Sequence, residues 1–349
     1  MKRFFLVCCL FFICSFIKAQ KKDTVTVIGV GDIMMGSNYP NGGVLPPDNG
    51  STLMKEVAPV LSSADVTMGN LEGVLLNEGG TPKTCKDPKV CYVFRSPENY
   101  VQNLVDAGFD VMSVANNHAG DFGDVGRKSS MKSLGNAGLE YAGQTTKPYT
   151  TFTRDNIRYG FAAFAPNGGC MNLNDLAGAK AIVAHLDSVS DVVIISFHGG
   201  AEGAQYQHVP RINEIFHGEN RGNVYQFAHQ LIDAGADIIL GHGPHVTRAV
   251  EVYKNRFISY SLGNFCTYGG INVAGVSGLS PIIKVFTNSE GAFYKAQITS
   301  TYQTFRGPVK IDPEKRVLNR IQELSKQDFP ENSYTIDNEG WIKPSTIPR

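Results

Sequence analysis

The chain alternates short apolar runs with segments of helical spacing from residue 24 onward. The apolar runs are rich in Val, Ile and Phe and end at glycine or polar residues, which is typical of buried strands. The predicted strands are Thr24–Val30, Asp65–Met68, Phe109–Ala115, Arg158–Ala165, Asp191–Phe197 and Ala236–Leu240. The predicted helices are Ser51–Leu61, Ser96-Pro97 to Gly108, Gly123–Ala137, Asn223–Ala234 and Pro313 to Gln327. This alternation predicts an α/β core.

An antiparallel portion is predicted towards the end of the chain. Its two hairpins are Val250–Tyr253 with Arg256–Ser261, and Pro281–Thr287 with Ala292–Ile298. Tyr260–Phe265 is predicted to be a buried strand, in which Asn264 supports the wall of a site. The domain organisation that follows is one domain over residues 21–300 and a C-terminal extension over residues 301–349.

The first twenty residues have the pattern of a secretory signal. Lys2 and Arg3 precede an uncharged run over residues 4–17, and a small residue, Ala19, precedes a polar stretch. The run is shorter than the roughly 20 residues of a membrane-spanning helix. We therefore expect an exported protein in the periplasm, the cell envelope or the extracellular space. An uncleaved signal is the alternative, and it would be the route to membrane association.

Charge and cysteine content narrow the function classes. The chain has 32 Lys+Arg and 32 Asp+Glu, and loss of residues 1–20 leaves 29 against 32, a net charge of −3. Such a balance argues against nucleic acid as a partner, because that affinity rests on Lys and Arg neutralising phosphates. Cys85 and Cys91 are predicted to pair, since export permits disulfides. Cys170 and Cys266 are expected to be free and buried.

Polar clusters come directly after five of the predicted strands. Their members are Asp32, Asn70 and Glu72, Asn117 and His118, His198, and His242 and His245. Ligands of open α/β sheets bind at the carboxyl ends of the strands, so these side chains are expected to share one site. Carboxylate and imidazole groups together suit Mn, Zn or Fe, and two such ions would hold a phosphate ester between them.

Six motifs occur in a fixed order between residues 31 and 265. They are Gly31-Asp32-Ile33-Met34-Met35-Gly36, Gly69-Asn70-Leu71-Glu72, Ala115-Asn116-Asn117-His118, His198-Gly199-Gly200-Ala201-Glu202, Gly241-His242-Gly243-Pro244-His245 and Tyr260-Ser261-Leu262-Gly263-Asn264-Phe265. In these motifs the chain resembles the CapA (PGA_cap, polyglutamate capsule synthesis) family, a branch of the calcineurin-like metallophosphoesterases. The resemblance implies a four-layer α/β/β/α sandwich.

The resemblance also implies roles for single residues. The implied metal ligands are Asp32, Glu72, Asn117, His198, His242 and His245. Asp32 and His118 are the implied catalytic residues, with His118 assisting the leaving group or orienting a phosphate. Asn70, Glu202 and Arg95 are expected to bind substrate. Asp121 is expected to position His118 or its loop rather than to bind metal.

One departure from the family pattern bears on the number of ions. The superfamily has an Asp-x-His motif where this chain has Asp32-Ile33-Met34, so one metal position loses its histidine. One ion and a full pair of ions both remain open at this point.

The function implied is the making, anchoring, transport or trimming of an anionic cell-envelope polymer such as polyglutamate, by metal-dependent hydrolysis if the protein is an enzyme. One alternative is a metal-dependent phosphoesterase that acts on a phosphate ester without a capsule role. Another is a non-catalytic scaffold of a polymer-synthesis complex, which Met34 favours. The basic stretch of Lys83, Lys86, Lys89 and Arg95 is interpreted as a solvated loop, with retention of an anionic polymer as its alternative.

Overall fold

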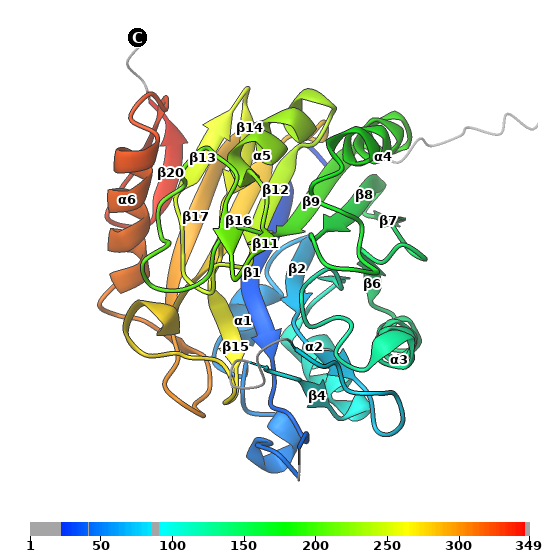
Figure 1. Ribbon diagram of the computed structural model, residues 1–349. Helices are drawn as coiled ribbons and strands as arrows, with labels where there is room; N and C mark the ends of the chain where they lie inside the picture. Colours follow the sequence, from blue (N-terminus) through cyan, green and yellow to red (C-terminus); the bar gives the residue numbers. More distant parts are fainter. Residues whose placement is uncertain (1–21, 41, 86–90, 346–349) are drawn as a thin grey trace, which may run out of the picture.

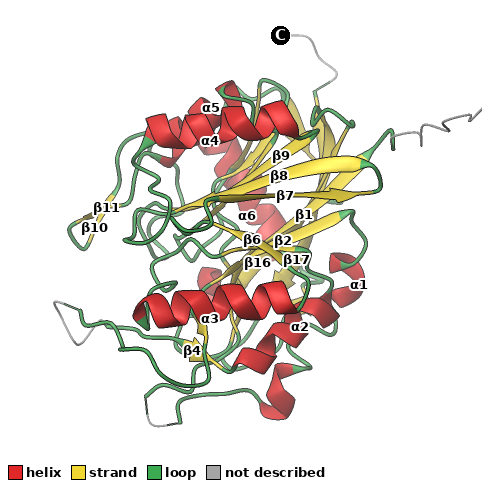
Figure 2. Ribbon diagram, turned by 90° about the vertical axis from the view of Figure 1, so that its right-hand side faces the viewer, coloured by secondary structure: helices red, strands yellow, loops and turns green. Residues whose placement is uncertain are grey.

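The computed structural model describes residues 22–40, 42–85 and 91–345. Two large β-sheets lie face to face, and each has helices on its outer face (Figures 1 and 2). This is the predicted four-layer α/β/β/α sandwich. The predicted signal over residues 1–20 lies outside the described residues, as do Lys86 and Lys89.

The first sheet is mixed and has the order β19-β20-β17-β16-β1-β2-β5-β6, with β15 beside β1 and β18 beside β17. Its strands are β1 (Val25–Met34), β2 (Val66–Leu71), β5 (Val111–Ser113), β6 (Glu140–Ala142), β15 (Asn264–Thr267), β16 (Leu279–Thr287), β17 (Phe293–Tyr302), β18 (Lys310–Ile311), β19 (Tyr334–Ile336) and β20 (Trp341–Pro344). Strands β1, β2, β5 and β6 run parallel, so their carboxyl ends share one edge.

The second sheet has the order β13-β14-β12-β9-β8-β7. Its strands are β7 (Tyr149–Arg154), β8 (Ile157–Phe164), β9 (Val192–His198), β12 (Ile238–His242), β13 (Val250–Tyr253) and β14 (Arg256–Ser259). The central strands β8, β9, β12 and β14 are parallel. Two small ribbons pair β3 (Val74–Leu75) with β4 (Arg95–Ser96) and β10 (Ile215–Phe216) with β11 (Glu219–Asn220).

Helices cover the outer face of each sheet (Figure 2). The helices are α1 (Ala58–Leu61), α2 (Val101–Ala107), α3 (Gly123–Asn136), α4 (Leu176–Val189), α5 (Val224–Asp233) and α6 (Arg316–Asp328), with 3-10 turns η1 (Pro47–Gly50), η3 (Glu98–Tyr100) and η4 (Gly275–Gly278). Helices α1, α2 and α3 pack on the first sheet, and α4 and α5 pack on the second. Within the described residues, no helix is both long and apolar enough to span a bilayer.

The main core lies between the two sheets. Side chains such as Val27 and Met68 from the first sheet meet Phe161, Ile194 and Leu240 from the second, all with no exposed surface. Helix α6 adds apolar side chains at the border of this core. The segment predicted as a C-terminal extension thus supplies β18, α6, β19 and β20 to the same sheet and core.

Two predicted elements differ from the structure. The spacing predicts one helix over Ser51–Leu61, but residues 51–57 form turns and α1 spans only Ala58–Leu61. Proline is favoured in the first turn of a helix but disrupts a helix interior. The helix therefore begins at Ala58, with Pro59 in its first turn. The apolar run predicts one strand over Tyr260–Phe265, but β14 ends at Ser259 and β15 begins at Asn264 in the other sheet.

The crossing between the sheets has a physical cause. Gly263 adopts a left-handed conformation with φ of 66°, which breaks the extended backbone. The chain then continues parallel to β1, with Asn264 opposite Asp32. The crossing therefore delivers Asn264 to the carboxyl edge of the first sheet.

Candidate metal centre

The first sheet supplies the carboxylates of the site. Asp32 lies within β1, opposite Asn70 of β2, because the strand continues four residues beyond the predicted end at Val30. The Asn70 side-chain amide donates to Asp32 Oδ1 over 2.8 Å. Glu72 follows β2, and its backbone amide donates to the Ile33 carbonyl over 2.9 Å. Asp32 and Glu72 are both buried at this edge.

The second sheet supplies two histidines at the equivalent edge. His198 is the last residue of β9 and His242 is the last residue of β12, and the two are opposite each other in the parallel pairing. Neither side chain has exposed surface. His242 Nδ1 lies 3.2 Å from Asp32 Oδ1, which places the two sheet edges in direct contact.

His245 connects the carboxylates of both sheets. It adopts a left-handed conformation with φ of 57°, which turns the chain back after β12. Its Nδ1 lies 3.0 Å from both Asp32 Oδ2 and Asn264 Oδ1. Its Nε2 lies 3.5 Å from Glu72 Oε1 and 4.0 Å from Glu202 Oε2.

The donor set fits a divalent cation. Ligand atoms of Asp32, Glu72 and His198 lie within 4.8 Å of one another, and all three residues are buried. Several buried atoms of the cluster donate and accept no hydrogen bond among the described residues: Glu72 Oε1, Asn117 Oδ1, and both ring nitrogens of His198 and of His242. Unsatisfied buried polar atoms are costly, and a cation bound to them would remove that cost.

Protonation of the cluster follows from burial and mutual charge. Burial disfavours the charged form of Asp32, but the close approach of the His242 and His245 rings to its carboxylate outweighs burial and holds the pKa of Asp32 well below its ordinary value. Burial, and then the charge of Asp32, raise the pKa of Glu72 well above its ordinary value. Burial, and then the charge of Arg221, hold the pKa of His198 far below its ordinary value, so its imidazole is neutral and suited to bind metal.

His245 behaves in the opposite way. Burial favours its neutral form, but the charge of Glu72 and the hydrogen bond with Asp32 outweigh burial and raise the pKa of His245 to about 10. In the protein without a cation, the His245 imidazolium therefore balances the surrounding carboxylates.

The segment after β5 brings His118 to the cluster. Asn116 has a structural role, because its side-chain amide donates to Asn70 Oδ1 and to the Leu71 carbonyl. Asn117 has the unsatisfied side-chain oxygen described above. His118 Nδ1 lies 2.8 Å from Asp121 Oδ2, so Asp121 orients the ring as expected. Burial lowers the pKa of His118, despite the opposing charge of Asp121.

Arg221 is a neighbour of the site that sequence reasoning did not identify. It follows β11, is 2% exposed, and its Nη2 lies 2.8 Å from Glu202 Oε1. Glu202 in turn faces His245, so Arg221 holds this predicted substrate-binding carboxylate at the border of the cluster. A single arginine between two motifs has no local sequence signal that would have singled it out.

The structure places Arg95, a predicted substrate-binding residue, in contacts outside the cluster. Its Nε donates to Asn38 Oδ1 over 2.6 Å, and its guanidinium lies 5.0 Å from the centre of the Phe122 ring. Met34, at the position of the missing histidine, is buried beside Gly270. Arg248 is fully buried and donates two hydrogen bonds of 2.7 and 2.8 Å to the Glu214 carboxylate.

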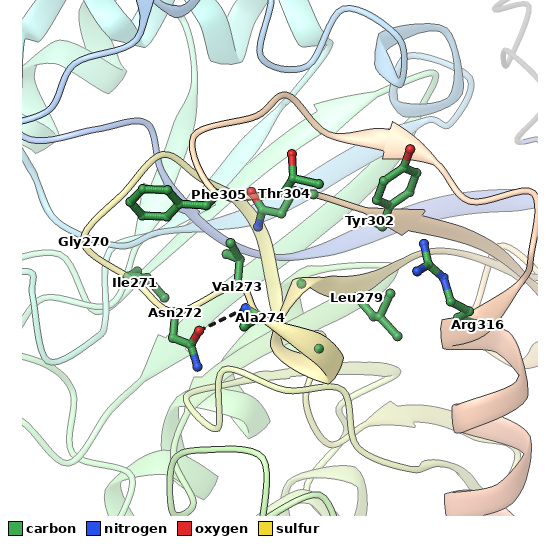
Figure 3. A pocket seen from close by; sticks show the side chains of 13 residues that line it. Gly270, Ile271, Asn272, Val273, Ala274, Leu279, Tyr302, Thr304, Phe305 and Arg316 are labelled. Carbon is green, nitrogen blue, oxygen red and sulfur yellow. Dashed lines mark hydrogen bonds between the residues drawn. The ribbon is translucent and has the colours of Figure 1, made fainter.

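A cavity of about 790 Å³ lies around η4 and the end of β17 (Figure 3). It is lined by residues 270–275, by residues 302–305 and by Gly278, Leu279 and Arg316. None of the predicted site residues lines it. Asn264 connects the two regions, because its side-chain amide donates to the carbonyls of His245 and Asn272.

Comparison with known proteins gives a match over most of this architecture. The family model described as "Bacterial capsule synthesis protein PGA_cap" matches residues 26–268. The capsule biosynthesis protein CapA of Bacillus anthracis is 29% identical over 268 residues, which cover 71% of this chain and 61% of that protein. The PGA biosynthesis protein CapA of Bacillus subtilis is 27% identical over 326 residues, which cover 89% of this chain and 80% of that protein.

Solved structures give weaker matches. A hypothetical protein from Thermus thermophilus is 16% identical with a TM-score of 0.45, covering 83% of this chain and all of that one. A 5'-nucleotidase precursor from the same organism is 11% identical with a TM-score of 0.44, covering 87% of this chain and 58% of that one. At these TM-scores, neither likeness supports a statement about the site.

Proposed function

Because the chain belongs to the bacterial capsule synthesis protein PGA_cap family, we propose that it acts on an anionic cell-envelope polymer of the polyglutamate type at a metal-dependent hydrolytic site. The observation that carries the proposal is the set of buried imidazole, carboxamide and carboxylate atoms without hydrogen bonds at the junction of the two sheets. The match covers less than two thirds of the Bacillus anthracis protein. The identity of the polymer, the export of this chain and the reaction it catalyses are therefore proposed and are not taken over from that protein.

In this proposal the ligands come from both sheets. Asp32 and Glu72 of the first sheet and His198 and His242 of the second would hold the cation, with Asn117 as a further ligand. A bound divalent cation supplies Lewis acidity and lowers the pKa of a coordinated water towards neutrality.

The other side chains orient substrate and transfer protons. Asp121 accepts from His118 Nδ1 and so leaves Nε2 free to exchange a proton with the leaving group. Asn70 holds the Asp32 carboxylate in place through a 2.8 Å hydrogen bond. Its effect on a substrate would therefore be indirect and would depend on the position of Asp32. Glu202, held by Arg221, borders the site where a substrate would enter.

The test combines metal analysis with hydrolysis assays. We expect the protein purified from residue 21 to contain Mn, Zn or Fe and to shorten polyglutamate. Asp32→Ala and His242→Ala should each lose the metal and at least a hundredfold of turnover. His217→Ala, an exposed histidine outside the cluster, is the matched control and should retain both. Metal-free wild-type protein with no turnover would contradict the proposal.

Two other functions have distinct outcomes in the same test. Turnover of a chromogenic phosphate ester, without cleavage of polyglutamate, would identify a phosphoesterase. Met34 at the usual histidine position favours a scaffold without catalysis, and a cellular phenotype that survives both substitutions would identify that function.

A further inference from the structure

The loop around the Cys85–Cys91 disulfide reaches His118 from two sides. Before the disulfide, Lys83 Nζ forms an ion pair with Asp121 Oδ1 at 2.6 Å, and the Lys83 backbone amide donates to the Asp121 carbonyl over 2.8 Å. After the disulfide, the Phe94 backbone amide donates to Asp121 Oδ2 over 2.6 Å. Both arms of the loop therefore end on Asp121.

The same two arms also touch His118 and its neighbour directly. The centres of the Phe94 and His118 rings are 4.3 Å apart. Lys83 Nζ lies 3.2 Å from the Asn117 carbonyl oxygen and 3.3 Å from His118 Nδ1. His118 is thus enclosed by an aromatic ring on one side and by the Lys83–Asp121 pair on another.

These contacts set the orientation and the tautomer of His118. Asp121 has no exposed surface, and its ionised carboxylate accepts hydrogen bonds but cannot donate them. The proton between it and His118 therefore resides on Nδ1, so Nε2 is the ring nitrogen that can exchange a proton with a substrate. If Asp121 turned away, both the orientation and this tautomer would lose their support.

The disulfide keeps the two arms together. Cys85 is two residues from Lys83, and Cys91 is three residues from Phe94. Without the cross-link, each arm would have to be ordered separately, at a greater loss of conformational entropy. The cross-link therefore favours simultaneous contact of both arms with Asp121.

We propose that Lys83 and Phe94 are positioning residues for His118, and that the Cys85–Cys91 disulfide keeps both in place. The catalytic consequence rests on the function proposed above, in which His118 assists the leaving group. The positioning itself does not depend on that function, and so it can be tested separately.

The test uses protein from residue 21 onward, produced in an oxidising compartment with ¹⁵N-labelled histidine. In wild type, we expect a protected Nδ1–H proton resonance from His118, identified by its loss in His118→Gln. Lys83→Met and the double variant Cys85→Ser/Cys91→Ser should lose this resonance, and Lys83→Arg should retain it. Lys132→Met, an exposed lysine on α3, is the matched control and should resemble wild type.

Metal content and turnover complete the test. Both loop variants should keep the wild-type metal content, because they replace no proposed ligand and Lys83 approaches Asn117 only at its backbone carbonyl oxygen. They should lose about tenfold or more in turnover, part of what a general acid contributes. A resonance and a turnover unchanged in the cysteine-free variant and in Lys83→Met would overturn the proposal. A resonance lost in both variants of a wild type that hydrolyses nothing would support the positioning and overturn the proposed hydrolysis.

Discussion

At the scale of single residues, the buried groups of the site differ in the charges that lie beside them. His245 lies between Asp32 and Glu72 and is held as a cation by them, whereas His198 beside Arg221 is held neutral. The two histidines have the same chemistry, and their neighbours separate their roles. His198 is suited to bind a metal ion, and His245 balances charge until one is bound.

The residues of the cluster could be predicted from the sequence because they lie at the ends of predicted strands. Asp32, His198 and His242 each accompany glycines at the carboxyl end of an apolar run, and parallel pairing brings such ends to one edge. Lys83 could not be found in this way. It was interpreted as part of a solvated basic loop, since its approach to Asp121 depends on a fold made by distant segments.

The two free thiols give a prediction at the same scale. Burial raises the pKa of Cys266 to about 12 and also raises the pKa of Cys170 above its ordinary value. The thiolate is the reactive form, so a raised pKa suppresses reaction near neutral pH. We expect protein purified from residue 21 to show no thiol titre with Ellman's reagent at pH 8 until it is denatured, and then a titre of two. Rapid labelling of native protein would contradict this burial.

At the scale of elements, apolar pattern and turn chemistry were sufficient for most of the fold. Asn223 caps α5 by accepting from the Gln226 amide, and the hairpin of β13 and β14 turns at Lys254 and Asn255 as predicted. Helix α4 was not predicted, although Asp175 caps it. Its buried face has only three buried side chains, Ala179, Val183 and Leu186, so its apolar pattern is short.

The crossing from β14 to β15 is the element that sequence reasoning could not supply. An apolar run carries no information about which sheet each of its halves will join. The crossing segment lies against β1 so closely that a Cβ added to Gly31 would be 2.0 Å from the Gly263 carbonyl oxygen. Backbone-to-backbone contact of this kind leaves no room for a side chain.

Gly31→Ala should therefore destabilise the protein. We expect a loss of about 1–3 kcal/mol or more in the free energy of unfolding, since a methyl group in a filled space forces the backbone to move. Chemical denaturation measures this loss. Gly168→Ala is the matched control, because an added Cβ there meets no atom within 4 Å, and it should be nearly neutral. Equal stability of the two variants would show that the crossing can move away from β1.

At the scale of the whole molecule, the candidate metal centre joins the two sheets. Asp32 and Glu72 come from the first sheet, and His198 and His242 from the second. A cation bound to this set would favour only the state in which both sheets are folded and packed. Metal affinity and global stability should therefore be linked.

Metal addition should consequently raise the melting temperature. At a free metal concentration of 100 times Kd, the expected stabilisation is about 2.7 kcal/mol. For a chain of this size, that corresponds to a rise of roughly 5 °C. Differential scanning calorimetry of chelator-treated protein, titrated with Mn²⁺ or Zn²⁺, measures it. Asp32→Ala should show no rise, and a wild-type protein insensitive to both metals would contradict the linkage.

Whether the disulfide beside His118 is formed depends on the compartment in which the protein is produced. A reducing cytoplasm would leave Cys85 and Cys91 as thiols, whereas an oxidising compartment would join them. Other segments supply the proposed metal ligands, so protein from either host would bind metal to the same extent. Under the positioning proposal, only the oxidised protein would turn over substrate at the full rate. Two preparations of one polypeptide, equal in sequence and metal content, would then differ in specific activity according to the host that produced them.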